Sequence, residues 1–217
     1  MKKFGIIISG LGYDDGSSVW DVCYILREIE RYGAKVFPYV PRESVERNIP
    51  GIRRKSSPMR DFSKEASLLV RGDVFFIDDA DPKELDALLF PGGKGNITIL
   101  SSILRDGTEA QVIPELRELV AGVYVREKFI GALGYGAALV AFILKSRIKP
   151  IITINDDAQI VEVIKSVGAD VMKVQPHEVI FDEENKILTS PGTSPGSSLF
   201  RASLGIEVLI KRILGKK

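Results

Sequence analysis

Short apolar runs alternate with amphipathic segments along most of this chain, and this alternation limits the possible fold more than any other feature of the sequence. The runs at 4–9, 87–90 and 128–133 are rich in Ile, Leu and Phe, as strands buried on both faces are. Because strands that alternate with helices form parallel sheets covered on both faces, we predict an α/β fold. It has a mostly parallel central sheet, helices on both faces and a C-terminal β-hairpin.

The same patterns predict the individual elements. The expected strands are 4–9, 35–40, 87–90, 128–133, 151–153, 170–174, 179–181 and 187–189. Helices are expected from Ser18 to Gly33, at 63–70, from Asp81-Pro82, from Pro114, at 137–144, at 156–167 and at 198–214. Ser18 and Asp21 fit a capping box, in which each side chain bonds the other residue's backbone amide. The basic segment 41–58 is expected to be a solvated excursion, and the lack of repeats or a long linker predicts one domain over 1–217.

The composition excludes several classes of protein. A single Cys and a single His cannot form an internal disulfide or a zinc-finger ligand set, so we predict a cytoplasmic protein without metal or cofactor. Lys and Arg (30) nearly balance Asp and Glu (29), which predicts no general attraction to nucleic acid. No apolar run approaches the roughly 18 residues of a membrane span. The four Asn and three Gln residues are few, as is typical of heat-adapted proteins.

Glycine-rich turns follow three of the expected strands, after Ser9, Phe90 and Leu133. In open α/β sheets ligands bind beyond the carboxyl ends of the strands, so these loops are expected to border one crevice. The loop 9–16 imitates a dinucleotide fingerprint, but its third glycine comes one residue late, and Asp14 and Asp15 occupy the place of a pyrophosphate. The loop 91–96 lacks the Walker spacing, and its backbone amides suit an anion or oxyanion within reach of Lys94.

The third turn, 131–136, has the architecture of a nucleophile elbow. In such an elbow a strained residue between strand and helix points its side chain into the crevice. That residue is Gly134 here. Glycine adopts positive φ without steric cost, so it keeps the turn while removing the reacting atom.

Four blocks of sequence together resemble the PfpI superfamily, within the class I glutamine amidotransferase-like fold, and above all its ElbB-type, glyoxalase-like branch. They are 4–12, 87–95, 131–139 and 182–192, in the family's order. The resemblance covers nearly the whole chain. It implies a flavodoxin-like three-layer sandwich and a homodimer, since relatives are commonly oligomeric.

The resemblance also implies a mechanism from which this chain departs. In active relatives a cysteine at the elbow is the nucleophile, a glutamate after the first strand bonds its thiol, and backbone amides form an oxyanion hole. The resemblance places Gly134 at the cysteine and Ser18 at the glutamate, with the amides of Gly93 and Tyr135 at the oxyanion hole. Both groups that perform the chemistry are therefore missing.

We predict a binding, regulatory or structural protein with no catalytic residue. Its expected small-molecule crevice is lined by Asp15, Ser18, Gly92, Gly93, Lys94, Gly134 and Tyr135. Two alternatives stay open. One is a slow glyoxalase-like or amidase/hydrolase enzyme that uses Tyr135, an Asp of the first loop or a residue of a partner subunit. The other is an amidotransferase-like subunit of a synthase.

The other reactive side chains have structural explanations. Cys23 lies on the apolar stripe of the first helix and is expected in the core. His177 falls outside every motif and is expected in a surface loop. Tyr135 is assigned equally to filling space and to binding a polar ligand. The basic run 53–55 lacks the interleaved aromatics typical of nucleic-acid binding.

Overall fold

A computed structural model describes residues 1–42 and 59–216 of the chain. Within them, seven strands form one sheet in the order β3-β2-β1-β4-β5-β9-β8, and β6 and β7 form a second, two-stranded sheet. The strands are β1 Lys3–Ile7, β2 Lys35–Val40, β3 Phe75–Phe76, β4 Ala87–Phe90, β5 Phe129–Leu133, β6 Ile151–Ile152, β7 Asp170–Val171, β8 Ile180–Asp182 and β9 Ile187–Ser190.

Neighbouring strands of the large sheet are parallel except for the β8–β9 hairpin. Strands β1, β4 and β5 lie at its centre, where Gly5 is opposite Leu88 and Leu88 is opposite Ile130. Every residue of β4 is buried, as its uninterrupted apolar run predicts. The predicted sandwich with a mostly parallel sheet and a C-terminal hairpin is confirmed.

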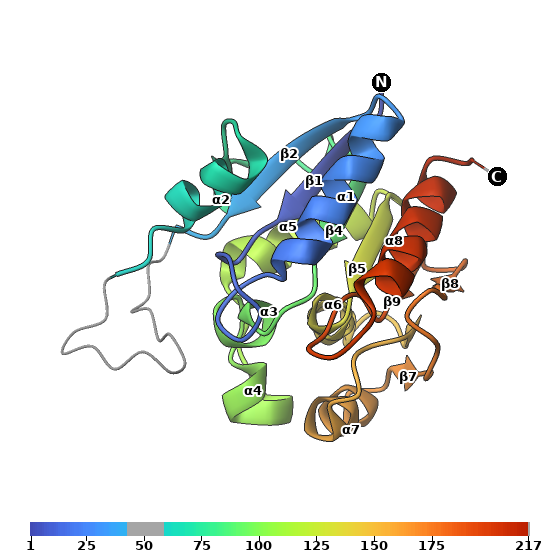
Figure 1. The fold of residues 1–217 in the computed structure, drawn as a ribbon. Helices are drawn as coiled ribbons and strands as arrows, with labels where there is room; N and C mark the ends of the chain where they lie inside the picture. Colours follow the sequence, from blue (N-terminus) through green and yellow to red (C-terminus); the bar gives the residue numbers. More distant parts are fainter. Residues whose placement is uncertain (43–58, 217) are drawn as a thin grey trace.

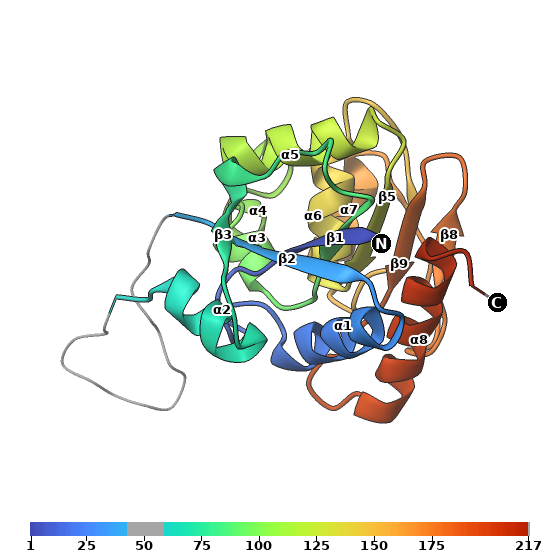
Figure 2. The same ribbon diagram turned by 90° about the horizontal axis from the view of Figure 1, so that it is seen from above.

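Eight α-helices of the described residues surround the sheet. They are α1 Val19–Arg31, α2 Phe62–Val70, α3 Gly95–Thr98, α4 Ile103–Asp106, α5 Pro114–Tyr124, α6 Tyr135–Leu144, α7 Ala158–Ser166 and α8 Leu199–Ile213. Helices α1, α2 and α8 cover one face of the sheet, and α5 and α6 cover the other (Figure 2). Each face has its own buried apolar cluster. Helices α4 and α7 lie at the end of the molecule opposite the chain termini (Figure 1).

The strands expected at 151–153 and 170–174 do not join the central sheet. They form the separate β6–β7 pair, because β9 already pairs with β8 on its outer edge. Side chains bridge the two sheets instead: the amide of Ile151 donates to Asp182 Oδ2 at 3.0 Å, and the amide of Thr153 donates to Thr189 Oγ1 at 2.9 Å.

Asp81-Pro82 begins a turn and not a helix. The amide of Lys83 donates to Asp81 Oδ1 at 2.8 Å, and that of Glu84 donates to the Asp81 carbonyl at 3.0 Å. The next residue, Leu85, is already buried against the core ahead of β4, which leaves no length for a second helical turn. Of the basic segment 41–58, the part at 43–58 lies outside the described residues.

Candidate functional site

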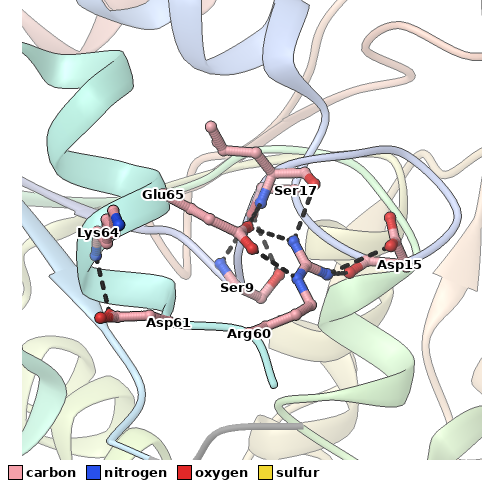
Figure 3. Close-up of polar contacts among 8 residues, drawn as sticks. Ser9, Asp15, Ser17, Arg60, Asp61, Lys64 and Glu65 are labelled. Atoms are coloured by element: carbon pink, nitrogen blue, oxygen red, sulfur yellow. Dashed lines mark hydrogen bonds and ion pairs between the residues drawn. The ribbon is translucent and has the colours of Figure 1, made fainter. Parts of the chain in front are cut away.

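The loop 10–17, which follows β1, is held by a buried arginine and its acidic partner (Figure 3). Arg60 is 3% exposed, donates to the carbonyl oxygens of Leu11 and Asp15, and pairs with Glu65. Glu65, on α2, also accepts the Leu11 amide at 2.8 Å. The side chain of Asp15 faces Arg60 as well, at 3.5 Å. These bonds from Arg60, just before α2, and from Glu65 on α2 fix the path of the loop at the carboxyl edge of the sheet.

A fully buried carboxylate, Asp21 on α1, ties together the turns after β4 and β9. It accepts the amide of Gly92 at 2.9 Å and both the amide and the hydroxyl of Thr193, at 2.8 Å and 2.7 Å. Burial raises the pKa of Asp21 to about 6, although the bonds from Thr193 and Gly92 oppose this shift. Ser18 caps α1 by accepting the Asp21 amide at 3.3 Å, and its Oγ lies 2.6 Å from Thr193 Oγ1. The predicted capping box is thus half formed, because the Asp21 carboxylate bonds these turns and does not return to Ser18.

Gly134 joins β5 to α6 with φ 48° and ψ −119°, a conformation that favours glycine. Its amide donates to the carbonyl of Ser190 at 3.0 Å. A Cβ on Gly134 would overlap Asn155 Oδ1 and would lie 2.9 Å from Asn155 Cγ and 3.0 Å from the Pro191 carbonyl oxygen. The amide of Asn155 therefore occupies the place that a side chain on the elbow would take.

Two tyrosines lie beside the elbow, with ring centroids 6.4 Å apart. Tyr135 is 4% exposed, and its hydroxyl donates to Asp157 Oδ2 at 2.7 Å. Burial and the bond to Asp157 raise the pKa of Tyr135 above its ordinary range, while burial and the charge of Asp21 raise the pKa of Tyr13 to about 12. The hydroxyl of Tyr13 accepts a bond from Asn155 Nδ2 at 3.1 Å. Both phenols are therefore protonated at neutral pH.

Two cavities flank the loop 193–197. The larger, about 820 Å³, is lined by both tyrosines, the segment 154–159 at the start of α7, residues 173–176 and the backbone at 191–197. The smaller, about 420 Å³, is lined mainly by the start of α1 and by Leu199. In the part of the chain that the structure describes, no three His, Cys, Asp or Glu side chains are grouped as a metal site.

Comparison with known proteins identifies the fold and its relatives. No family profile matches the sequence. The ES1 protein homolog of Rattus norvegicus is 25% identical over 98% of this chain and 83% of its own length. The human glutamine amidotransferase-like class 1 domain-containing protein 3 is also 25% identical, over 98% of this chain and 82% of its own. Among solved structures, an Ehrlichia chaffeensis isoprenoid biosynthesis protein with an amidotransferase-like domain has a TM-score of 0.89 at 24% identity, over 99% of both chains.

The chain thus resembles in sequence proteins named ES1 and glutamine amidotransferase-like class 1, and it has the fold of solved DJ-1/ThiJ/PfpI proteins. The predicted resemblance to this superfamily is thereby confirmed. DJ-1beta of Drosophila melanogaster has the same fold, with a TM-score of 0.60 at 14% identity.

The relatives correct the predicted cellular location. The rat, human and zebrafish proteins are all named as mitochondrial. The cytoplasmic prediction, which rested on the scarcity of cysteine, is therefore wrong, because reduced thiols are compatible with more than one compartment. In residues 1–42 and 59–216, no helix combines the length and apolar character needed to cross a membrane.

The predicted crevice residues are close in space but do not line one cavity. Tyr135 lines the larger cavity and Ser18 the smaller. Gly92 bonds Asp21, and a Cβ on Gly93 would lie 2.6 Å from the Ser18 nitrogen, so both glycines pack against neighbouring backbone or side chains. Neither cavity is lined by these glycines or by Gly134.

The two charged residues of the predicted crevice are directed to other partners. Lys94 pairs with Asp14 at 2.9 Å, and Asp15 faces Arg60. Neither lines the two cavities. The anion site expected at Lys94 therefore has its cation already neutralised by a carboxylate of the neighbouring loop.

Sequence reasoning missed the side chains that shape the larger cavity, Tyr13, Asn155 and Asp157. One signal was available: the polar run 155–157 directly follows the expected strand 151–153, at a carboxyl end where ligands bind. The approach of this run to Gly134 could not be predicted from the sequence, because β6 lies outside the main sheet.

The single thiol and the single imidazole lie outside this site. Cys23 is on α1 but is partly exposed and not in the core as expected, because Val22 and Ile25 take the buried side of the helix. Burial still raises the pKa of its thiol. His177 is exposed in a turn, in agreement with its expected surface position.

Proposed function

We propose that this chain is a non-catalytic member of the PfpI superfamily, in its ElbB-type branch, that binds a small molecule beside the elbow in a regulatory or structural role. The observation that carries the proposal is the occupied elbow. Gly134 supplies no reacting atom, and the Asn155 amide fills the space into which a nucleophile would project.

The position of the assisting glutamate supports the same proposal. Ser18 is 3% exposed, caps α1 and contacts Thr193. The hydroxyl of Thr193 in turn donates to Asp21. The hydroxyl of Ser18 is therefore used within a structural chain of hydrogen bonds and has no nucleophile to assist.

The alternative of a slow enzyme that uses Tyr135 has less support. A general base must lose its proton near the working pH. The Tyr135 hydroxyl is buried, donates to Asp157 and has its pKa raised, so it holds its proton at neutral pH.

The test restores the missing groups stepwise, in a Cys23→Ser background so that the new thiol is the only one. The variants are Gly134→Cys, Gly134→Cys with Asn155→Ala, and both changes with Ser18→Glu. Thiol alkylation measured by intact mass and conversion of methylglyoxal are the readouts, and thermal unfolding checks folding. We expect a reactive thiol only where Asn155 is removed, and methylglyoxal conversion only in the variant with the added glutamate.

Asn155→Ala alone is the matched control, because it opens the elbow without supplying a thiol, and it should stay inactive. Methylglyoxal conversion by the unmodified protein that Tyr135→Phe abolishes would instead favour the enzyme. Rapid alkylation of Gly134→Cys with Asn155 in place would contradict the occupied elbow.

A further inference from the structure

The described residues that line the smaller cavity carry no charge at neutral pH. The cavity lies between the start of α1 and the loop 193–197, and its volume of about 420 Å³ is within the range of small-molecule sites. Its apolar and aromatic lining residues are Tyr13, Val19, Trp20, Pro195 and Leu199. The others are glycine, serine and threonine, so the cavity offers no ion partner to a charged ligand.

Most of the hydroxyl groups at this cavity are already bonded within the protein. Thr193 Oγ1 donates to Asp21 Oδ1 at 2.7 Å, and Ser18 Oγ lies 2.6 Å from Thr193 Oγ1 and accepts the Asp21 amide at 3.3 Å. Ser197 Oγ donates to the Ser194 carbonyl at 2.7 Å and accepts the Ser194 amide at 2.9 Å. A ligand with several polar groups would lose its bonds to water and find few partners here, which costs binding free energy. An apolar ligand avoids this cost.

Trp20 gives the cavity an exposed aromatic wall. This residue is 53% exposed at the start of α1, although tryptophan is highly buried on average. Its ring stacks on that of Tyr24, one turn along the helix, with centroids 6.2 Å apart and an interplanar angle of 27°. The stacking restrains the indole ring before a ligand binds. An aromatic ligand in the cavity would cover apolar surface of Trp20 and pair with its ring.

We propose that the smaller cavity binds an uncharged aromatic small molecule, held against Trp20. The proposal rests on the binding role proposed above and names the cavity and its ligand class. Tyr13 lines both cavities, and its ring centroid is 6.4 Å from that of Tyr135, so the smaller cavity is also beside the elbow.

Calorimetric titration of the purified full chain tests this with naphthalene derivatives that differ in charge: 2-naphthalenemethanol, 2-naphthoate and 2-naphthylmethylammonium. We expect the neutral alcohol to bind about ten-fold more tightly than either ion, or better, because the cavity has no partner for their charge. Trp20 is the only tryptophan of the chain, so its single indole N–H resonance in NMR spectra reports on this cavity. The neutral probe should shift that resonance.

Trp20→Ala should weaken binding of the neutral probe about ten-fold, because the ring contact and the covered apolar area are both lost. Trp20→Phe keeps an aromatic ring and should retain most of the affinity. Phe75→Ala is the matched control, because it removes a 41% exposed ring on β3 that lines neither cavity. This control should leave the affinity within about two-fold of that of the unmodified protein. Thermal unfolding checks that each variant is folded.

Equal or tighter binding of either ion, no binding of the neutral probe, an unshifted indole resonance or an unchanged affinity in Trp20→Ala would overturn the proposal. Binding of the neutral probe only after dilution to single chains would also overturn it, and would assign the cavity to a side chain of a second copy. Conversion of methylglyoxal by the unmodified protein would overturn only the proposed non-catalytic role, so the two failures are distinguishable.

Discussion

The buried carboxylate of Asp21 holds together three segments around the elbow. Its carboxylate joins α1 to the turn at Gly92 and to the loop at Thr193, and the elbow lies between these segments. A Cβ on Gly92 would lie 2.5 Å from Asp21 Oδ2, and one on Gly192 would lie 2.8 Å from it. Both glycines are therefore required by the close approach of this carboxylate.

The raised pKa of Asp21 predicts a pH-dependent stability. A carboxyl with an ordinary pKa of 3.8 and a folded-state pKa of about 6 binds its proton more tightly in the folded chain. Its stabilising contribution is therefore complete below about pH 4 and is lost as the pH rises through about 6. Between these limits the loss is roughly 2–3 kcal/mol.

Denaturant unfolding of Asp21→Asn at pH 4 to 7 checks this expectation. The free energy of unfolding of the unmodified protein should fall between pH 4 and pH 7. For Asp21→Asn this fall should be smaller by the contribution of Asp21. Asp156→Asn, which removes an exposed carboxylate, should show the same fall as the unmodified protein. Parallel pH profiles for the unmodified protein and Asp21→Asn would show that Asp21 does not titrate in this window.

At the level of single residues, the sequence predicted that glycine occupies the elbow. It did not predict that the Asn155 side chain fills the space beside this glycine. The strand-to-helix turn around Gly134 is a local pattern, so its position followed from the residues alone. The contact with Asn155 joins residues 21 positions apart through the packing of the small β6–β7 sheet, which no local pattern encodes. The same holds for the pairing of Lys94 with Asp14.

At the scale of elements, the first loop depends on α2. The loop is glycine-rich, and its backbone is held by Arg60, which precedes that helix, and by Glu65 on it (Figure 3). The long apolar strands and the amphipathic helices were predictable because their periodicity is strong. The short strands β6 and β7 were predicted as strands, but their pairing with each other was not predicted, because two-residue pairing depends on which sheet edge is free.

Loss of the arginine should destabilise this region strongly. The side chain of Arg60 is 1% exposed, so Arg60→Ala removes a buried ion pair with Glu65 and the bonds to the Leu11 and Asp15 carbonyls, and it should lower the free energy of unfolding by about 3–5 kcal/mol. Arg42→Ala removes an arginine that is 51% exposed and pairs with Asp78, and it should destabilise the protein far less, because solvent screens surface ion pairs. Denaturant unfolding compares the two. Equal losses would mean that Arg60 contributes no more than a surface ion pair.

At the scale of the whole molecule, the homodimer implied by the family stays a prediction. Phe200, Leu204 and Val208 follow one another at four-residue spacing on α8 and are 71%, 37% and 38% exposed. Exposed apolar patches mark interfaces in soluble proteins. Light scattering on the purified protein should give a mass twice that of one chain. Phe200→Asp should lower the measured mass toward that of one chain. A single-chain mass at tens of micromolar would contradict the dimer.

The central proposal is that the fold of the DJ-1/ThiJ/PfpI proteins is present here without catalytic activity. The most direct measurement is the rate at which the unmodified protein, with Tyr135→Phe beside it, converts methylglyoxal and releases ammonia from glutamine at neutral pH. The occupied elbow predicts rates equal to those of buffer for both proteins. A rate above buffer that disappears in Tyr135→Phe would contradict the claim and place the catalytic group at the start of α6.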